Sequence, residues 1–292
     1  MSLLLAMLAP MLAQVGPFAN QPAAPPLRPP AEGRQRSAQP AAAPAHSAAA
    51  PATPAPRSRL DYCLDAATST PVDAIDDAEG WRDAVQGSAK AEPNLCLGSA
   101  HARLESWDEA EAAFLAGRDA AAENDRQFRA KLGAMAGNAA LAQGAWERAL
   151  APLEMALADA KAASDLRLTG EVQIDRARAL VALKREAEAS DALVEARTSA
   201  ADNSLAWLLS ATLSRRQGKL GPAQAQIATA AQLAPRDPEV GLEAGVIAML
   251  AGNEAAARKS WQSAIDTAPA SEAAATAKGY LAQLSASPQS KP

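Results

Sequence analysis

Small and large apolar positions repeat in a fixed order along the chain. Ala110, Phe114 and Gly117 are spaced i, i+4, i+7, which places them on one face of a helix. This small, large, small stripe recurs four more times, displaced by 39, 40, 34 and 34 residues. A chance amphipathic helix would not keep this register. The five stripes begin with Ala110 and Phe114, Ala149 and Leu153, Ala189 and Leu193, Ala223 and Ile227, and Ala257 and Trp261.

Another small residue lies twelve positions before each stripe. This spacing predicts a second helix ahead of each stripe helix, and Gly144, Gly218 and Gly252 mark the break in three units because glycine adopts positive φ without steric cost. Each unit is therefore predicted to be an antiparallel helical hairpin, with paired small residues allowing close approach and the large residue filling the gap to the next hairpin. The upstream small residues are Gly98, Gly137, Ala177, Ala211 and Gly245.

The segments on either side of the repeats are predicted to be caps. In residues 58–90, Pro71 is a helix-start signal and Trp81 follows at helical spacing, which indicates a degenerate hairpin. Residues 271–286 are expected to form a terminal helix that covers the last apolar face, and residues 287–292 a disordered tail. The five repeats occupy residues 91–270.

Composition favours closely stacked helices. The chain has 79 alanines and only 3% aromatic residues. Alanine is the best helix former, and its small side chain lets helix axes approach closely. The expected fold class is therefore all-α, an α-solenoid of antiparallel helical hairpins behind a disordered N-terminal tail.

The hairpins resemble tetratricopeptide repeats (TPRs). The 34-residue pattern of that family has a Leu-Gly pair, then an aromatic residue, alanine, a large residue, alanine and a closing proline. The run from Leu97-Gly98 to Phe114 and the units that end at Pro235 and Pro269 match it well. The resemblance covers about residues 91–270. Arg176-Ala177 replaces Leu-Gly in the third unit, and the first three units lack the closing proline, so we expect an irregular superhelix there.

The resemblance implies a concave groove lined by the first helix of each hairpin. Its arginines would concentrate positive charge, suited to an extended or helical peptide with apolar anchors and acidic groups. Family members that clamp a C-terminal carboxylate use a Lys and Asn set, of which only Asn138 is present because Ala134 replaces the lysine, so that ligand is not expected. The groove candidates are Arg103, Asn138, Leu141, Arg178, Leu208, Arg215, Arg216 and Val246.

The two cysteines are one repeat apart. Cys63 and Cys96 are separated by 33 residues, so the hairpin pattern places them on the first helices of adjacent hairpins. A disulfide is the leading interpretation; a reactive thiol and two small buried residues are the alternatives.

No pattern of catalytic residues stands out. His101 occupies a position where the family places an aromatic residue, so a packed histidine is expected, and His46 lies in a Pro/Ala-rich segment. The sequence has no glycine-rich phosphate loop, Ser-His-Asp set or metal-ligand spacing. We expect no enzymatic activity, cofactor or metal. The net charge is −5, of which residues 1–57 contribute +3, so residues 58–292 carry −8, which argues against nucleic-acid binding.

The N-terminal segments predict export. Residues 1–16 contain an apolar run of signal-peptide length, although no Lys or Arg precedes Arg28 and Met11 is unfavourable for cleavage after Ala13. Residues 17–57 form a predicted disordered linker, with 11 Pro and 14 Ala between positions 17 and 56. A periplasmic location is predicted, with tethering at the inner membrane or a cytoplasmic location as alternatives.

Together these features predict a non-enzymatic scaffold or adaptor in the bacterial cell envelope that binds protein or peptide segments. The alternatives are a membrane-tethered subunit or assembly factor of an envelope complex and a cytosolic TPR regulator.

Overall fold

The computed structural model describes residues 57–286, and this part of the chain is helical throughout, with thirteen α-helices, one short 3-10 helix and no strand. The first hairpin consists of α2 (Arg59–Ser69) and α3 (Pro71–Ala84), and the 3-10 helix η1 (Gly87–Lys90) follows it. The next hairpins are α4 (Ala91–Arg103) with α5 (Trp107–Ala120), α6 (Arg126–Ala142) with α7 (Trp146–Ala162), and α8 (Leu166–Ala182) with α9 (Glu186–Ser199). The last are α10 (Ser204–Arg216) with α11 (Leu220–Leu233), α12 (Pro238–Leu250) with α13 (Glu254–Thr267), and the single helix α14 (Glu272–Ala286).

Side-chain caps fix where many of these helices begin. A polar side chain just before the helix accepts a hydrogen bond from a backbone N–H of the first turn, which satisfies a donor that has no partner within the helix. These caps are Asp125 at α6, Asp165 at α8, Asn203 at α10, Asp237 at α12 and Asn253 at α13.

The turn inside each repeat hairpin contains a residue in the left-handed region. Gly144, Gly218 and Gly252 have φ of +75°, +73° and +78°, as their sequence positions predict. Glu105 and Lys184 occupy the equivalent positions of the other two hairpins, with φ of +59° and +61°. The turn geometry is thus common to all five hairpins, although two of them lack glycine.

Close contact between small and large residues holds each hairpin together. A Cβ atom on Gly98 would lie 2.5 Å from the Phe114 ring, and one on Gly137 would lie 2.5 Å from Leu153 Cγ, so neither position has room for a side chain. The large residues also belong to cores shared with the next helix pair. All thirteen predicted repeat positions are buried: Gly98, Ala110, Phe114, Gly137, Ala149, Leu153, Ala189, Leu193, Ala223, Ile227, Gly245, Ala257 and Trp261.

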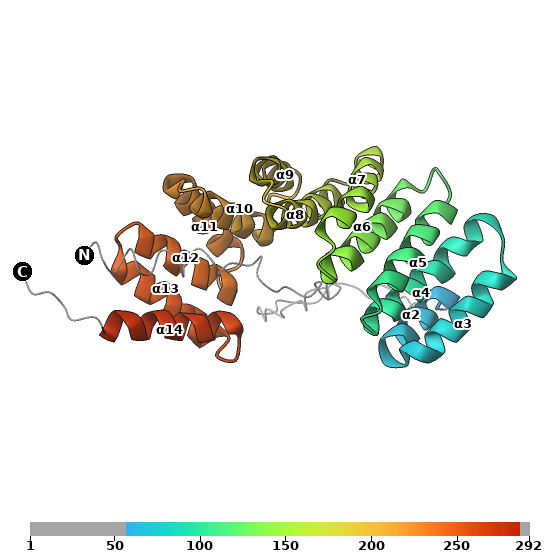
Figure 1. Cartoon of the computed structure of the whole chain (residues 1–292), viewed down its shortest axis with the longest axis horizontal. Helices are drawn as coiled ribbons and strands as arrows, with labels where there is room; N and C mark the ends of the chain where they lie inside the picture. The colour runs from blue at the N-terminus through green and yellow to red at the C-terminus, as the bar shows by residue number, and fades with distance from the viewer. Residues whose placement is uncertain (1–56, 287–292) are drawn as a thin grey trace, which may run out of the picture.

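The hairpins stack into an arch (Figure 1). The second helix of each repeat hairpin packs on the first helix of the next one, as α5 does on α6 and α7 on α8. First helices also pack on one another, α6 on α8, α8 on α10 and α10 on α12, and in Figure 1 α6 and α8 lie inside α7 and α9. We call the surface that α4, α6, α8, α10 and α12 form on this side the inner face.

Both ends of the repeat array are covered. At the C-terminal end, α14 packs on α12 and α13, and the rings of Trp261 and Tyr280 lie 5.1 Å apart between centroids. At the N-terminal end, α2 packs on α3 and α4, and a disulfide joins Cys63 of α2 to Cys96 of α4 with a Cα to Cα distance of 6.0 Å. Of the three interpretations of the cysteine pair, the structure therefore has the disulfide.

The predicted signal-like segment, the linker up to residue 56 with His46, and the tail of residues 287–292 lie outside the described residues. Between residues 57 and 286, none of the helices combines the length and the apolar character that crossing a membrane requires.

Candidate binding surface on the inner face

The structure separates the eight predicted groove residues into two groups. Arg103 and Arg216 are exposed and Asn138 and Arg178 are half-buried, so these four reach the surface. The other four are buried: Leu141 is 5% exposed, Leu208 2%, Arg215 6% and Val246 1%. The expectation that these four line an open groove is wrong. Leu141, Leu208 and Val246 lie in apolar cores together with residues of the second helices α7, α11 and α13, and Arg215 pairs with Glu243 of α12.

Arg215 is held by a buried carboxylate on the next hairpin. Its Nε donates to Glu243 Oε1 at 2.7 Å and its Nη2 to Oε2 at 3.3 Å, and both side chains are 3% exposed. Burial raises the pKa of Glu243, and the adjacent Arg215 guanidinium opposes that shift. This fork-shaped pair ties α10 to α12, and Arg215 is therefore not a ligand-binding cation.

A second polar cluster lies between α6 and α8. Arg178 Nη1 donates to Asp175 Oδ1 at 3.3 Å, and Asn138 on the neighbouring helix hydrogen-bonds to the same carboxylate. Burial raises the pKa of Asp175, while Arg178 and Asn138 favour its charged form. Asn138 Oδ1 is buried and accepts no hydrogen bond within the described part of the chain. This cluster places polar groups near the middle of the inner face.

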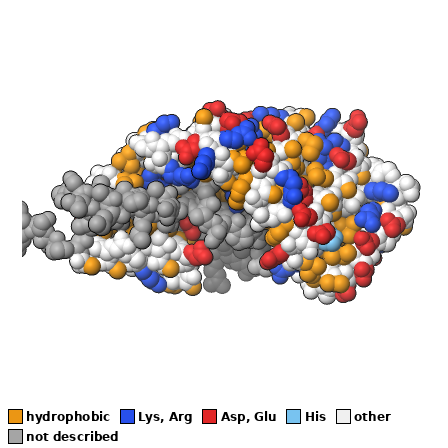
Figure 2. Space-filling view, viewed as in Figure 1, with side chains coloured by type: hydrophobic (Ala, Val, Ile, Leu, Met, Phe, Trp, Pro, Cys, Tyr) orange, Lys and Arg blue, Asp and Glu red, His pale blue; other side chains and the backbone are white. Residues whose placement is uncertain are grey.

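Carboxylates neutralise most of the arginines expected to make the groove positive. Arg178 pairs with Asp175, Arg215 with Glu243, and Arg216 Nη2 lies 3.8 Å from Glu186 Oε1. On the side of the molecule that Figure 2 shows, acidic and basic side chains are interspersed where described residues are visible. Three of the four groove arginines thus have a carboxylate partner, so these residues do not concentrate positive charge as predicted.

The histidine and the cysteines that could have carried reactive chemistry are part of the packed helices. His101 is half-buried on α4, and Cys96, on the same helix, is bonded to Cys63, which removes the reactive-thiol interpretation. Within residues 57–286, no three His, Cys, Asp or Glu side chains are grouped in a way that could hold a metal ion.

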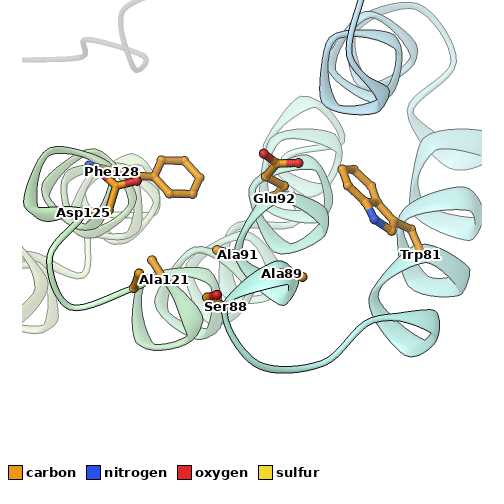
Figure 3. Close-up of a pocket in the computed structure, with 9 residues that line it drawn as sticks. Trp81, Ser88, Ala89, Ala91, Glu92, Ala121, Asp125 and Phe128 are labelled. Atoms are coloured by element: carbon orange, nitrogen blue, oxygen red, sulfur yellow. Dashed lines mark hydrogen bonds between the residues drawn. The ribbon is translucent and has the colours of Figure 1, made fainter.

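Two features of the structure were not predicted. Asp159 is 3% exposed and accepts hydrogen bonds from Arg118 Nη2 at 2.7 Å and Arg126 Nη1 at 2.9 Å. Its partners come from α5 and α6, 41 and 33 residues away, so no local pattern signals the cluster. The second feature is an open recess of about 420 Å³ near the N-terminal ends of α4 and α6, lined in part by Trp81, Glu92 and Phe128 (Figure 3).

No family model matches the chain, and no curated protein matches it. Solved structures do. PilW, a type IV pilus biogenesis factor, aligns at 15% identity and a TM-score of 0.58, covering 76% of this chain and 99% of its own. BtubC from P. vanneervenii aligns at 14% identity and a TM-score of 0.55, covering 81% and 96%. MamA from Desulfovibrio magneticus RS-1 aligns at 14% identity and a TM-score of 0.51, covering 62% and 97%.

At these identities the similarity concerns the fold. The arrangement agrees with the repeat pattern: five hairpins with the small, large, small stripe in register, stacked through their first helices and capped at both ends. The described part of the chain is therefore an α-solenoid with the tetratricopeptide-repeat fold.

Proposed function

We propose that this protein is a non-enzymatic scaffold that holds a segment of a partner protein against its inner face. The observation that carries the proposal is the direct stacking of α6, α8, α10 and α12, which makes one continuous surface from several repeats. Such a surface is assembled before a partner arrives, so most of the ordering cost of binding falls on the partner segment.

The side chains on this surface narrow the type of partner. Large apolar residues such as Leu208 and Val246 are buried, whereas small and polar residues reach the surface. Three of the four predicted groove arginines already have a carboxylate partner, so a partner segment finds few unpaired charges. An extended segment that contacts the surface through its backbone and small side chains fits better than an acidic helix with large apolar anchors.

The proposed setting is the bacterial cell envelope. The Cys63–Cys96 disulfide supports it, because disulfides persist in oxidising compartments such as the periplasm. The fold similarity to PilW, a pilus biogenesis factor, gives independent support for an envelope assembly role. Alkylation of protein isolated from the host without reduction tests the setting: blocked cysteines support it, and two alkylated cysteines contradict it.

Site-specific photo-crosslinking tests the inner face. Ala182 is exposed at the end of α8, in the repeat position that Arg103 and Arg216 occupy on α4 and α10. A photo-reactive amino acid at Ala182 should give a discrete crosslinked partner in the native host. The matched control is Ala151, which is also exposed but lies on the second helix α7. Equal crosslinking at both positions, or none at Ala182, would contradict binding at the inner face.

A further inference from the structure

Three arginines in the described part of the chain lie over an aromatic ring. A guanidinium that stacks on a ring uses its flat face, so the N–H donors along its edge stay available for an acceptor in the same plane. The three pairs are Arg57 over Tyr62, Arg59 over Trp81 and Arg197 over Trp207, with the guanidinium carbon 4.8, 4.7 and 5.0 Å from the ring centroid.

Carboxylates of the chain complete the first two of these stacks. Arg57 Nη2 donates to Asp65 Oδ2, and Arg59 Nη2 donates to Asp77 Oδ1 at 3.1 Å. In both cases the ring holds one face of the guanidinium while a carboxylate accepts from its edge. The positive charge is thus both held in place and neutralised.

Arg197 has the ring but not the carboxylate. Its Nε donates to Leu193 O at 3.3 Å within the same helix, and between residues 57 and 286 no Asp or Glu oxygen lies within 4.0 Å of its guanidinium. Every other buried or half-buried arginine in that range has a carboxylate within this distance. Burial lowers the pKa of Arg197, and no nearby carboxylate opposes that shift.

The surroundings position this guanidinium. Arg197 lies in the last turn of α9, and Trp207 lies near the start of α10, where its Nε1 donates to Ala201 O at 2.8 Å and so fixes the ring against the connecting loop. Val194 is 52% exposed and lies one turn before Arg197 on the same side of α9. Because α9 lies outside α8 in the arch (Figure 1), this patch is a surface other than the inner face.

The acids closest to Arg197 in the sequence do not complete the third stack. Glu195 is paired with Lys161, whose Nζ lies 2.6 Å from its Oε1. Asp202, in the loop that follows α9, is exposed and forms no ion pair with Arg197. A carboxylate that completes this stack as Asp65 and Asp77 complete the others therefore has to come from another molecule.

We propose that Arg197, held on Trp207, binds the side-chain carboxylate of an Asp or Glu in a partner protein, and that Val194 contacts an apolar residue beside that acid. The two oxygens of a carboxylate match the parallel donors on the guanidinium edge. Residues 58–292 carry a net charge of −8, which repels strongly acidic segments, so the fitting segment has a single acid among apolar or uncharged residues. This site does not depend on the proposed function of the inner face.

NMR titration of the full-length chain with short blocked peptides tests this contact. The probe is acetyl-Ala-Leu-Glu-Leu-Ala-amide, and its matched control has Gln in place of Glu. The glutamate peptide should shift the indole N–H signal of Trp207 and the Nε–H signal of Arg197 until the site is saturated. The glutamine peptide should bind at least about tenfold more weakly, because it lacks the charge that strengthens the hydrogen bonds.

Variants of the chain locate the contact. Arg197→Lys keeps the charge but loses the planar fork, so it should weaken binding of the glutamate peptide about tenfold. Val194→Asp places a carboxylate three residues before Arg197, the spacing at which Asp175 pairs with Arg178, and should block the peptide by completing the stack from within the chain. Arg258→Lys is the matched control: this half-buried arginine already has a carboxylate partner, so the titration should not change.

Several outcomes would overturn the proposal. One is the absence of shifts with the glutamate peptide, and another is a titration that neither Arg197→Lys nor Val194→Asp changes; Val194 is exposed, so its replacement leaves the fold intact even where the arginine variant does not. A third is binding only of acetyl-Ala-Leu-Ala-Leu-Ala with a free C-terminal carboxylate, which would make a chain end the ligand. A fourth is a Trp207 signal that moves when the protein alone is diluted, which would show that a second copy supplies the carboxylate.

Discussion

Breaking the buried pair of Arg215 and Glu243 should strongly destabilise the C-terminal hairpins. At an Nε to Oε1 distance of 2.7 Å, the two charges attract with about 6 kcal/mol at an effective dielectric constant of about 20. Desolvation of two ions costs several kcal/mol each, so the pair as a whole contributes little net stability. Removing one partner is different, because the other charge stays enclosed without compensation.

We therefore expect Arg215→Met or Glu243→Met to lower the free energy of unfolding by about 3 to 5 kcal/mol each. The double variant should be far less destabilised than the sum of the two, since it buries no lone charge. Arg216→Met is the matched control: this neighbouring arginine is exposed, so its loss should change stability by less than about 0.5 kcal/mol.

Urea unfolding followed by circular dichroism measures these differences, and amide hydrogen exchange locates them. Solenoids can open from one end, so exchange should accelerate first in α10, α12 and α14. If Arg215→Met costs no more than Arg216→Met, or if the double variant is as unstable as the sum of the singles, the buried-pair reasoning fails.

Three further variants test the fold in other places. Replacing Cys63 and Cys96 by serine should lower stability by about 4 kcal/mol, because the disulfide closes a 33-residue loop in the unfolded chain; calorimetry with and without reductant measures this. Lys184→Gly should raise the unfolding temperature, since Lys184 has φ of +61° and glycine relieves a strain of about 1 kcal/mol. Burial, reinforced by nearby Asp237, raises the pKa of Glu239. At pH 7 the buried carboxylate of Glu239 is charged and destabilises the folded wild-type protein, so the Glu239→Gln variant should be more stable than the wild type. As the pH falls through the raised pKa, Glu239 takes up a proton in the folded state and this difference should disappear. Urea unfolding of both proteins at a series of pH values measures it.

The fold was predictable because the contacts that define each hairpin join residues that are close in the sequence. The contact between Gly98 and Phe114 joins positions sixteen residues apart, within one hairpin, and the same pairing recurs in the other repeats. Because the units share one register, a turn position seen in one repeat also locates the turn in the others. Lys184 gives no turn signal of its own, but it shares its register with Gly144, Gly218 and Gly252.

The inner face was predicted less well because burial there depends on how far apart neighbouring hairpins lie. A position on a first helix can lie in a core instead of on the surface, as Leu208 does with residues of α11 and α12 and Val246 does with residues of α13 and α14. The partner of Arg215 lies 28 residues further along the chain, so an arginine that looks like a ligand-binding group in the sequence is a structural one in the fold. The small residues made the close packing of the helices predictable. They did not predict which side chains that packing would bury.

Binding at the inner face should depend little on salt. On the inner face, arginines such as Arg178 and Arg216 are already paired with carboxylates of the chain, so an added partner gains little from charge. The screening length falls from about 8 Å at 0.15 M salt to about 3 Å at 1 M, which weakens exposed pairs most. Photo-crosslinking at Ala182 should thus persist when the salt is raised from about 0.15 M to about 1 M, and its loss would show that the inner face recruits its partner through charge.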